Sequence, residues 1–515
     1  MFECFKIRQP EMSARRLCVN KASFSIFDVP VVSFFSRSHC DRLNRKKGAV
    51  VSVLKSVILA RLILSLHIPA WSSADDLPAG QIADRVVCKA DASQTYALYL
   101  PSGFSKDRLW PILFCFDPGA RGRIPVELFR AAAEQYGYIV AGSNISRNGP
   151  QGRSVEAMKA MWEDTQDRFP LDPARVFLAG MSGGARTVCI FAQSSPLFAG
   201  VIAFAAGFPD ARAPAKVPFF FFGAAGRDDF NYPEMRQLDG DLERLGAVHR
   251  VVAFDGGHGW PPAEICTRGI EWLELQSMKA GKRPCDNAII DALHEKAAAL
   301  IRAAEGAGSP GELYLQEKAT VEDFRGLKDM TALETGAARL AASKEVRKYL
   351  QDEKGQQTLQ RNREAELHAQ WSRRYDGSES SDAVISFNSL LSDLKRQAEA
   401  ASDSPTRRIA RRVLEGSYIG ANEQSRGLLA NQNYQSAAKW MELAAAIHPD
   451  RFQLLYNLAT TYAKGRDRRG AVDALKRAVE QGFRDSGAFE QEAAFDFLRS
   501  DPAIKSLRER MQQKQ

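Results

Sequence analysis

The sequence predicts an α/β fold with a doubly wound, mostly parallel sheet, followed by an all-α helical-repeat region. Strand-like and helix-like stretches alternate over residues 85–278, and repeated β–α units build a parallel sheet. After residue 279 the β-branched runs fade, and Ala, Leu, Glu, Lys, Arg and Gln dominate, which is typical of helices. A chain of 515 residues is long enough for about two to four domains.

Each strand is expected where a short apolar or alternating run is bounded by turn residues. The run from Trp110 to Phe116 is apolar throughout and predicts a strand buried on both faces. The expected strands cover residues 94–100, 110–116, 138–141, 175–179, 200–206, 217–223 and 249–254. The expected helices cover residues 126–136, 155–167, 185–192, 232–245 and 263–278.

The chain is expected to divide into four segments. They are a leader at residues 1–74, the α/β domain at 75–280, a helical region at 281–415 and helical repeats at 416–515. Residues 279–284 form the linker after the α/β domain. Breaks between the later helices are expected at residues 306–311, 376–381 and 401–405.

Small and large apolar residues recur with a 34-residue period near the C-terminus. In residues 452–485 they are Leu455, Leu458, Ala459, Tyr462, Ala471, Leu475 and Ala478, and a looser set one period earlier is Leu428, Ala437, Met441, Ala444 and Pro449. This pattern resembles tetratricopeptide repeats, in which paired antiparallel helices pack closely. The resemblance implies a protein or peptide partner for the tail, and the alternative is a helical bundle without repeats.

The first 74 residues have features of a targeting segment. Basic residues precede a short apolar run at residues 62–70, and Ser72-Ser73-Ala74 then offers small residues at positions −3 and −1 of a cleavage site. The run is shorter than the roughly 20 residues that cross a bilayer, so no stable membrane span is expected. We expect export to the periplasm or the medium, with Asp75 near the mature N-terminus and a true translation start near residues 50–53. The alternative is a basic tail on a cytoplasmic protein.

The net charge of +8 is confined to this leader. Residues 1–74 hold 12 Lys and Arg against 4 Asp and Glu, and the rest of the chain holds 58 of each sign. A nucleic-acid partner is therefore not expected, because such proteins carry an excess of basic side chains.

Five cysteines follow the leader, and their spacing matches no metal site. They are Cys88, Cys115, Cys189, Cys266 and Cys285. Cys115 and Cys189 stand in apolar runs and are expected in the core, and a Cys266–Cys285 bridge is an option in an exported protein. We expect no bound metal.

The strongest chemical signal is Gly180-Met181-Ser182-Gly183-Gly184. It follows the apolar run at residues 176–179 and precedes an expected helix, which is the strand–turn–helix context of a nucleophilic serine. A serine hydroxyl needs a base to take its proton and an acid to orient that base. The alternative is a strand-to-helix turn in a non-catalytic α/β protein.

His258 is the expected base. The chain has seven histidines, of which only His249 and His258 lie in the α/β domain. His249 opens a strand and would point from the wrong end of the sheet, whereas His258 follows that strand in a glycine-rich loop. Asp229 is the expected acid because it comes three residues after a turn glycine, with Asp228 as the alternative.

An oxyanion hole needs two backbone N–H groups aimed at the developing negative charge. Gly183 should supply one, because it directly follows the expected nucleophile. The other should come from the loop after the strand at residues 110–116, where Pro118 has no N–H, so that Gly119 or Ala120 must donate. Arg121 faces either substrate or solvent on this interpretation.

The motifs at residues 180–184, 226–229 and 256–261 resemble those of the α/β-hydrolase superfamily. The resemblance covers about residues 90–278. Within the superfamily it is to the secreted poly(3-hydroxybutyrate) depolymerase and feruloyl esterase-like branch, and to the dienelactone hydrolase and phospholipase/carboxylesterase groups. It implies ester hydrolysis through an acyl-enzyme without a metal or organic cofactor. One departure is Asp117-Pro118, which stands where that branch usually has His-Gly.

These observations predict an exported serine esterase acting on a small-molecule or polymeric ester. Only 10 residues separate the expected strands at 200–206 and 217–223, which leaves no room for a large cap there and predicts an open site. Two alternatives stay open. One is a serine peptidase of the same fold, for which the sequence shows no acidic amine-binding motif, and the other is a helical-repeat scaffold whose hydrolase domain is secondary.

Overall fold

The computed structural model describes residues 77–149, 152–210, 212–374 and 381–512. The expected leader at residues 1–74, its cleavage site and the expected translation start lie outside these residues, as does most of the break expected at residues 376–381. None of the described helices is both long enough and apolar enough to cross a membrane.

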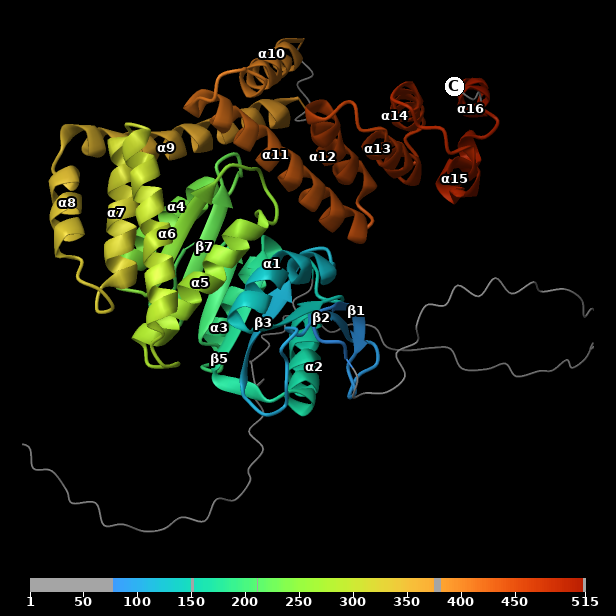
Figure 1. The fold of residues 1–515 in the computed structure, drawn as a ribbon. Helices are drawn as coiled ribbons and strands as arrows, with labels where there is room; N and C mark the ends of the chain where they lie inside the picture. Colours follow the sequence, from blue (N-terminus) through green and yellow to red (C-terminus); the bar gives the residue numbers. More distant parts are fainter. Residues whose placement is uncertain (1–76, 150–151, 211, 375–380, 513–515) are drawn as a thin grey trace, which may run out of the picture. The chain divides into compact units, whose positions relative to one another are not determined.

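One eight-stranded sheet forms the centre of the α/β domain and is drawn in blue through green in Figure 1. The strand order is β1-β2-β4-β3-β5-β6-β7-β8, with β1 and β2 antiparallel to their neighbours and all later pairs parallel. The strands are β1 (Ile82–Val87), β2 (Thr95–Tyr99), β3 (Trp110–Phe116), β4 (Ile139–Ser143), β5 (Leu171–Met181), β6 (Gly200–Phe204), β7 (Phe220–Gly226) and β8 (His249–Phe254). In such a sheet, loops that follow the parallel strands meet at one edge.

The strands agree with the sequence-based expectation except at three places, one of which is β5, which begins at Leu171, four residues earlier than expected. β1 was not predicted, because it is a mostly exposed edge strand without a clear apolar alternation. β7 begins at Phe220 and ends at Gly226, three residues later than expected, because Ala224 and Ala225 continue it despite their low strand propensity. Both alanines are buried, so packing rather than propensity extends the strand.

Helices cover both faces of the sheet, as a doubly wound fold requires. α1 (Arg123–Tyr136) and α5 (Ala263–Lys279) pack on one face, with Phe129 and Ile270 in their shared core. α2 (Gly152–Arg168), α3 (Gly183–Ser194) and α4 (Tyr232–Arg244) pack on the other face. The strand order and these helix positions are those of the α/β-hydrolase fold, which confirms the predicted fold class.

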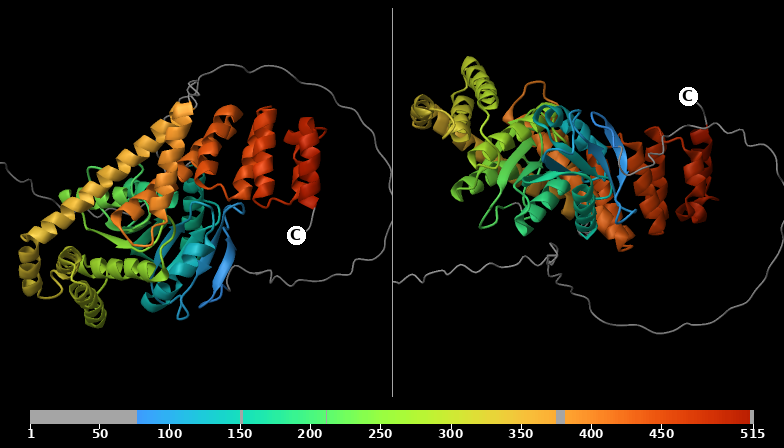
Figure 2. Two further views of the ribbon diagram at one scale, coloured as in Figure 1. Left: turned by 90° about the horizontal axis from the view of Figure 1, so that it is seen from above. Right: turned by 60° about the horizontal axis from the view of Figure 1, so that its bottom comes forward.

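The rest of the described chain is helical, as predicted, and is drawn from yellow-green to red in Figures 1 and 2. The expected boundary at residues 415 and 416 falls inside the continuous helix α11, so no break separates the two expected helical segments there. The elements are α6 (Asn287–Gly306), α7 (Pro310–Phe324), α8 (Thr331–Ala341), α9 (Lys344–Arg373), α10 (Ser381–Ala398), α11 (Pro405–Ala430), α12 (Tyr434–Ile447), α13 (Phe452–Lys464), α14 (Arg468–Glu480), α15 (Ser486–Gln491), the 3₁₀ helix η1 (Ala493–Leu498) and α16 (Pro502–Gln512).

Two helices near the C-terminus begin with the 34-residue spacing of the sequence pattern. α12 begins at Tyr434 and α14 at Arg468, which is 34 residues later. Most apolar positions selected in residues 452–485 are buried in one core; they are Leu455, Leu458, Ala459, Ala471, Leu475 and Ala478. That core extends from the end of α9 to α16, so these helices form one packed unit.

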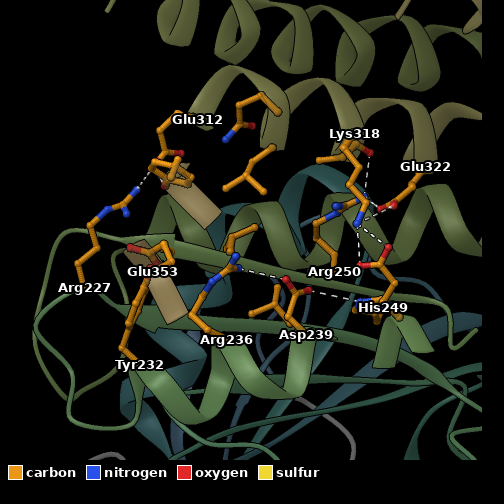
Figure 3. Close-up of a pocket in the computed structure, with 18 of the residues that line it drawn as sticks. Arg227, Tyr232, Arg236, Asp239, His249, Arg250, Glu312, Lys318, Glu322 and Glu353 are labelled. Carbon is orange, nitrogen blue, oxygen red and sulfur yellow. Dashed lines mark hydrogen bonds and ion pairs between the residues drawn. The ribbon is translucent and has the colours of Figure 1, made fainter. Parts of the chain in front are cut away.

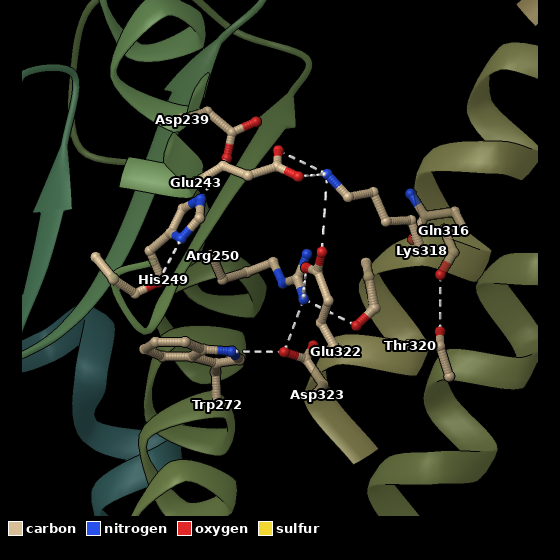
Figure 4. Close-up of polar contacts among 12 residues, drawn as sticks. Asp239, Glu243, His249, Arg250, Trp272, Gln316, Lys318, Thr320, Glu322 and Asp323 are labelled. Atoms are coloured by element: carbon tan, nitrogen blue, oxygen red, sulfur yellow. Dashed lines mark hydrogen bonds and ion pairs between the residues drawn. The ribbon is translucent and has the colours of Figure 1, made fainter. Parts of the chain in front are cut away.

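Paired charges join the α/β domain to α7. They surround a cavity of about 100 Å³ between α4, β8 and α7 (Figure 3). Arg250 on β8 donates to the Ala319 carbonyl at 2.8 Å and to Asp323 at 2.8 Å, both on α7 (Figure 4). Lys318 of α7 reaches back to Glu243 of α4 at 2.6 Å. Because opposite charges face each other here, the cavity is a structural junction rather than a site with an excess of one charge.

His249 lies at this junction, away from Ser182. Its Nε2 atom is 3.3 Å from Asp239 Oδ1, and its Nδ1 atom is 2.9 Å from the Ala247 carbonyl. Burial works to lower the pKa of His249, but the hydrogen bonds to Asp239 and to the Ala247 carbonyl outweigh it and hold the pKa above its ordinary value of 6.5. Both ring nitrogens face acceptors, and these contacts stabilise the doubly protonated ring.

The raised pKa of His249 predicts a loss of stability at alkaline pH. The folded state holds this proton more tightly than the unfolded chain, so the stabilisation is complete below pH 6.5 and is lost as pH rises through the folded-state pKa. Urea unfolding of the wild type and of His249→Gln at about pH 6 and about pH 9 measures it. The variant is expected to lose this pH-dependent part, and equal pH dependence in the two proteins would contradict the assignment.

Candidate active site

Ser182 stands in a strained turn between β5 and α3. Its backbone has φ 54° and ψ −120°, a conformation that residues with a side chain rarely adopt. The Ser182 N–H donates to the Phe204 carbonyl at 2.8 Å, and the Arg186 N–H donates to the Ser182 carbonyl at 3.1 Å. Contacts with β6 and α3 therefore hold a turn that would cost about 1–3 kcal/mol by itself.

Gly180 and Gly184 are required by close backbone packing on either side of Ser182. A Cβ atom at Gly180 would lie 2.4 Å from the Gly184 carbonyl oxygen, and one at Gly184 would lie 2.0 Å from the Phe116 carbonyl oxygen. One at Gly183 would lie 1.9 Å from Asn148 Oδ1. The motif therefore reflects the crossing of α3 over the ends of β3 and β5, which leaves no space for larger residues.

His258 lies between Ser182 and Asp229. Its Nε2 atom is 2.9 Å from Ser182 Oγ, and its Nδ1 atom is 2.9 Å from Asp229 Oδ1. Asp229 is fully buried and also accepts a hydrogen bond of 2.8 Å from the Asn231 N–H. The structure thus brings together, at the carboxyl edge of the sheet, the three side chains that the sequence selected.

The other two carboxylates of the acid and histidine loops point elsewhere. Asp228, the alternative acid, accepts a hydrogen bond of 2.8 Å from Arg411 Nη1 on α11. Asp255 is exposed and lies 3.6 Å from Arg227. The geometry therefore favours Asp229 over Asp228 as the partner of His258, and it gives Asp228 a contact with the helical region that the sequence did not suggest.

Asp117 organises the loop that follows β3. Its buried carboxylate accepts hydrogen bonds from the Gly119 N–H at 2.7 Å and from Arg121 Nε at 2.9 Å and Nη2 at 3.0 Å. It also accepts one of 2.8 Å from Trp260 Nε1, two residues after His258. Burial works to raise the pKa of Asp117, but the bonds from Arg121 and Trp260 and from the Gly119 N–H outweigh it, so the pKa lies below its usual range. The ionised Asp117 therefore ties this loop to the histidine loop.

This arrangement bears on the alternatives that the sequence left open for the loop. Gly119 is not available as the second oxyanion donor, because its N–H is directed at the Asp117 carboxylate. Arg121 is exposed to solvent, which is one of the two expected options, and its guanidinium is also bound to Asp117. Ala120 keeps the expected position: it has φ 60°, and its N–H makes only a long bond of 3.3 Å to the Asp117 carbonyl.

Gly183 begins α3 directly after Ser182. The first N–H groups of an α-helix have no partner within the helix, and they carry the positive end of its dipole. The Gly183 N–H therefore belongs to a ready anion-binding position beside the Ser182 hydroxyl.

A cavity of about 400 Å³ opens beside Ser182, and one of its walls comes from α11. Ile419 and Glu423 of that helix line it together with Arg147, Thr187 and Phe230. The cavity still opens to solvent, so α11 adds a wall on one side of the site rather than a cover. No described helix lies between β6 and β7, as the sequence predicted, and this wall comes from the C-terminal helices instead.

Sequence reasoning missed these lining residues for a physical reason. Ile419 and Glu423 stand more than 200 residues after Ser182 in a helix whose pattern indicates only packing. Asn148 had a weak signal, since it follows the parallel strand β4 and so lies at the carboxyl edge. In the part of the chain that the structure describes, no group of His, Cys, Asp and Glu side chains could hold a metal ion.

The thiols do not contribute to this site. Cys115 and Cys189 are buried in the core, as expected. Cys266 is buried on α5 and Cys285 is exposed beyond its end, and both are free, so the optional bridge is not formed.

Comparisons with known proteins find similar folds only. No protein-family model matches the chain, and no curated protein matches it. The solved structure of FphF, a fluorophosphonate-binding serine hydrolase of Staphylococcus aureus, is 16% identical, with a TM-score of 0.30, and covers 35% of this chain and 92% of its own. FrmB, an S-formylglutathione hydrolase of the same organism, is 15% identical, with a TM-score of 0.31 and coverage of 39% and 98%. An esterase of Pyrobaculum calidifontis is 13% identical, with a TM-score of 0.32 and coverage of 39% and 86%. Values this low transfer no activity, so the chemistry rests on the site's own geometry.

The strain at Ser182 predicts a stabilising substitution. Ser182→Gly is expected to raise the free energy of unfolding by about 1 kcal/mol, because glycine adopts a positive φ without the steric cost of a Cβ atom. Ser182→Ala keeps the Cβ atom and is expected to show no such gain. Urea unfolding of the three proteins measures the difference, and an equal gain in both variants would show that strain at this φ is not its cause.

Proposed function

We propose that this protein is a serine hydrolase that cleaves carboxylic esters through an acyl-enzyme intermediate. The observation that carries the proposal is the chain of two 2.9 Å hydrogen bonds from Ser182 through His258 to Asp229, beside a cavity. A nucleophile needs a base within about 2.6–3.2 Å and a third group that orients the base, and these distances meet that requirement.

In the first half of the reaction, Ser182 Oγ attacks the ester carbonyl while His258 Nε2 takes its proton. The tetrahedral intermediate then collapses, the ester C–O bond breaks, and His258 returns the proton to the leaving alcohol. In the second half, water attacks the acyl-enzyme with His258 again as the base, which releases the acid and restores the serine hydroxyl. Asp229 holds the Nδ1–H and stabilises the imidazolium that forms in each half.

The negative charge on the carbonyl oxygen requires two donors. The Gly183 N–H at the start of α3 is one. Ala120 is the better candidate for the second, because the Gly119 N–H already has a short bond to Asp117. Asp117 would act indirectly, by holding the backbone of its own loop against the histidine loop through Trp260.

Two features bear on the choice between ester and peptide substrates. Glu423 in the cavity wall is an acidic side chain that a serine peptidase could use to bind a substrate amine, a feature that sequence motifs did not show. Arg147 lines the same cavity and carries the opposite charge, so the wall as a whole does not select a cation. Esters remain the first proposal, and a panel of p-nitrophenyl esters and aminoacyl p-nitroanilides separates the two.

The helical tail and the location of the protein enter as proposals as well. The 34-residue spacing of α12 and α14 supports tetratricopeptide-like repeats that would bind a protein or peptide. The leader motif at residues 62–74 supports export. A scaffold with an inactive hydrolase domain is the alternative, and it would not react with an active-site probe.

A fluorophosphonate probe tests the proposed nucleophile. The wild type is expected to be labelled and to hydrolyse p-nitrophenyl acetate, and Ser182→Ala is expected to lose labelling and at least about 10³-fold in kcat/KM. Asp229→Asn is expected to lower kcat by about 10⁴-fold, because the orienting carboxylate is lost. Asp255→Asn changes an exposed acid in the segment just before His258 and is the matched control. Its kcat is expected to stay within about twofold of the wild-type value. A wild type that the probe does not label would overturn the proposal.

The wall formed by α11 predicts selectivity for the size of the substrate. Ile419→Trp fills part of the cavity, so kcat/KM for p-nitrophenyl octanoate is expected to fall about tenfold, while the acetate changes by less than about twofold. Ile385→Trp on α10 is the control, because Ile385 is 63% exposed and does not line the cavity. Equal effects of Ile419→Trp on both esters would contradict a role of this wall in selectivity.

A further inference from the structure

We propose that helix α11 holds the acid loop, residues 227–231, in its active geometry and that Arg412 and Arg411 are positioning residues for Asp229 and His258. The inference rests on the proposed function of these two side chains. It concerns a segment more than 170 residues away in sequence, which belongs to the helical region and not to the α/β domain.

Arg412 secures the start of the acid loop. Its side chain is almost fully buried, at 1% exposed, and Nε donates to the Arg227 carbonyl at 2.7 Å. Its guanidinium also lies 4.3 Å from the centre of the Tyr232 ring, at the other end of the loop. A buried guanidinium is costly unless it is paired, and these two contacts offset part of that cost, although Nη1 is buried without a hydrogen-bond partner among the described residues.

Two further contacts hold the residues on either side of Asp229. Arg411 Nη1 donates to Asp228 Oδ2 at 2.8 Å, and Gln360 Nε2 of α9 donates to the Phe230 carbonyl at 3.1 Å. The helical region therefore binds the loop at three of its five positions. Backbone bonds from Arg227 to the Phe254 carbonyl, at 2.8 Å, and from Asp228 to the Gly256 carbonyl, at 2.9 Å, then join the acid loop to the segment that carries His258.

A packing contact leads from α11 to the imidazole itself. A Cβ atom at Gly416 would lie 3.0 Å from Phe230 Cβ, so the helix backbone packs directly against Phe230. The Phe230 ring in turn lies 4.3 Å, centre to centre, from the His258 ring. Movement of the loop would therefore displace both the carboxylate and the aromatic neighbour of His258, and small misplacements of catalytic groups cost up to about 100-fold in rate.

Two glycines of α11 provide the sharpest test. Gly416→Ala and Gly427→Ala make the same change in the same helix, and alanine is the better helix former at both. Gly427 has nothing within 4 Å of an added Cβ atom, whereas at Gly416 the methyl group presses on Phe230. Gly416→Ala is expected to lower kcat about tenfold with KM within about twofold, and Gly427→Ala is expected to leave both unchanged. Equal kinetics in the two variants, both folded by circular dichroism, would overturn the inference.

The arginines provide a second, independent test. Arg411→Gln is compared with Arg477→Gln, because the two ion pairs have nearly the same exposure. The side chains of Arg477 and Glu442, 3.0 Å apart, are 37% and 21% exposed, and those of Arg411 and Asp228 are 38% and 23% exposed. Only Arg411→Gln is expected to lower kcat, by about three- to tenfold. Arg412→Met is expected to lower kcat by about 10- to 100-fold. Arg412→Lys should restore part of this kcat, because its ammonium can still donate to the Arg227 carbonyl.

A spectroscopic readout separates positioning from general stability. The far-downfield proton resonance of His258 Nδ1–H, which reports the bond to Asp229, is expected to weaken in Arg412→Met and Gly416→Ala but not in Arg477→Gln. A wild type without labelling or turnover would refute the proposed function. An active wild type with unaltered kcat in the α11 variants would refute this inference alone.

Discussion

Two hydrogen bonds, one on each side of the His258 ring, depend on loops that leave three different strands. Ser182 follows β5, Asp229 follows β7 and His258 follows β8. The three loops have to bring the Ser182 hydroxyl and the Asp229 carboxylate each to within about 3 Å of the His258 ring. Parallel strands bring these loops to one edge of the sheet, but they do not fix the exact distances between the three side chains. Those come from local constraints: the strained turn at Ser182, the contact of Gly184 with the Phe116 carbonyl, and the buried carboxylate of Asp229.

Asp117 shows how a buried carboxylate shapes the loop around it. A carboxylate at the end of β3 is buried, so it needs several donors, and it finds them in Gly119, Arg121 and Trp260. The consequence is a loop braced against the histidine loop by a charge. The same bracing directs one backbone N–H away from the position where an oxyanion would develop, which leaves Ala120 as the nearer candidate.

The helical region packs against the α/β domain and contacts the candidate site. Charges on α7 pair with those on α4 and β8, and side chains of α9 and α11 hold the loop that carries Asp229. α11 also closes one wall of the cavity beside Ser182 and then continues into the packed helices α12–α16. One continuous helix thus links the site to the packed helices for which a protein or peptide partner is proposed.

The sequence by itself determined the fold class, most strands and the choice of Ser182, His258 and Asp229, because each depends on local features: an apolar run, a glycine turn, a position just after a strand. It could not decide between Gly119 and Ala120, because that choice depends on where the Asp117 side chain turns. It gave no indication that Ile419, Glu423, Arg411 and Arg412 reach the site, and it gave no sign of the wall that α11 adds to the site. Contacts between segments far apart in the chain depend on how the α/β domain and the helical region pack against each other. The hydrophobic periodicity within either part does not reveal that packing.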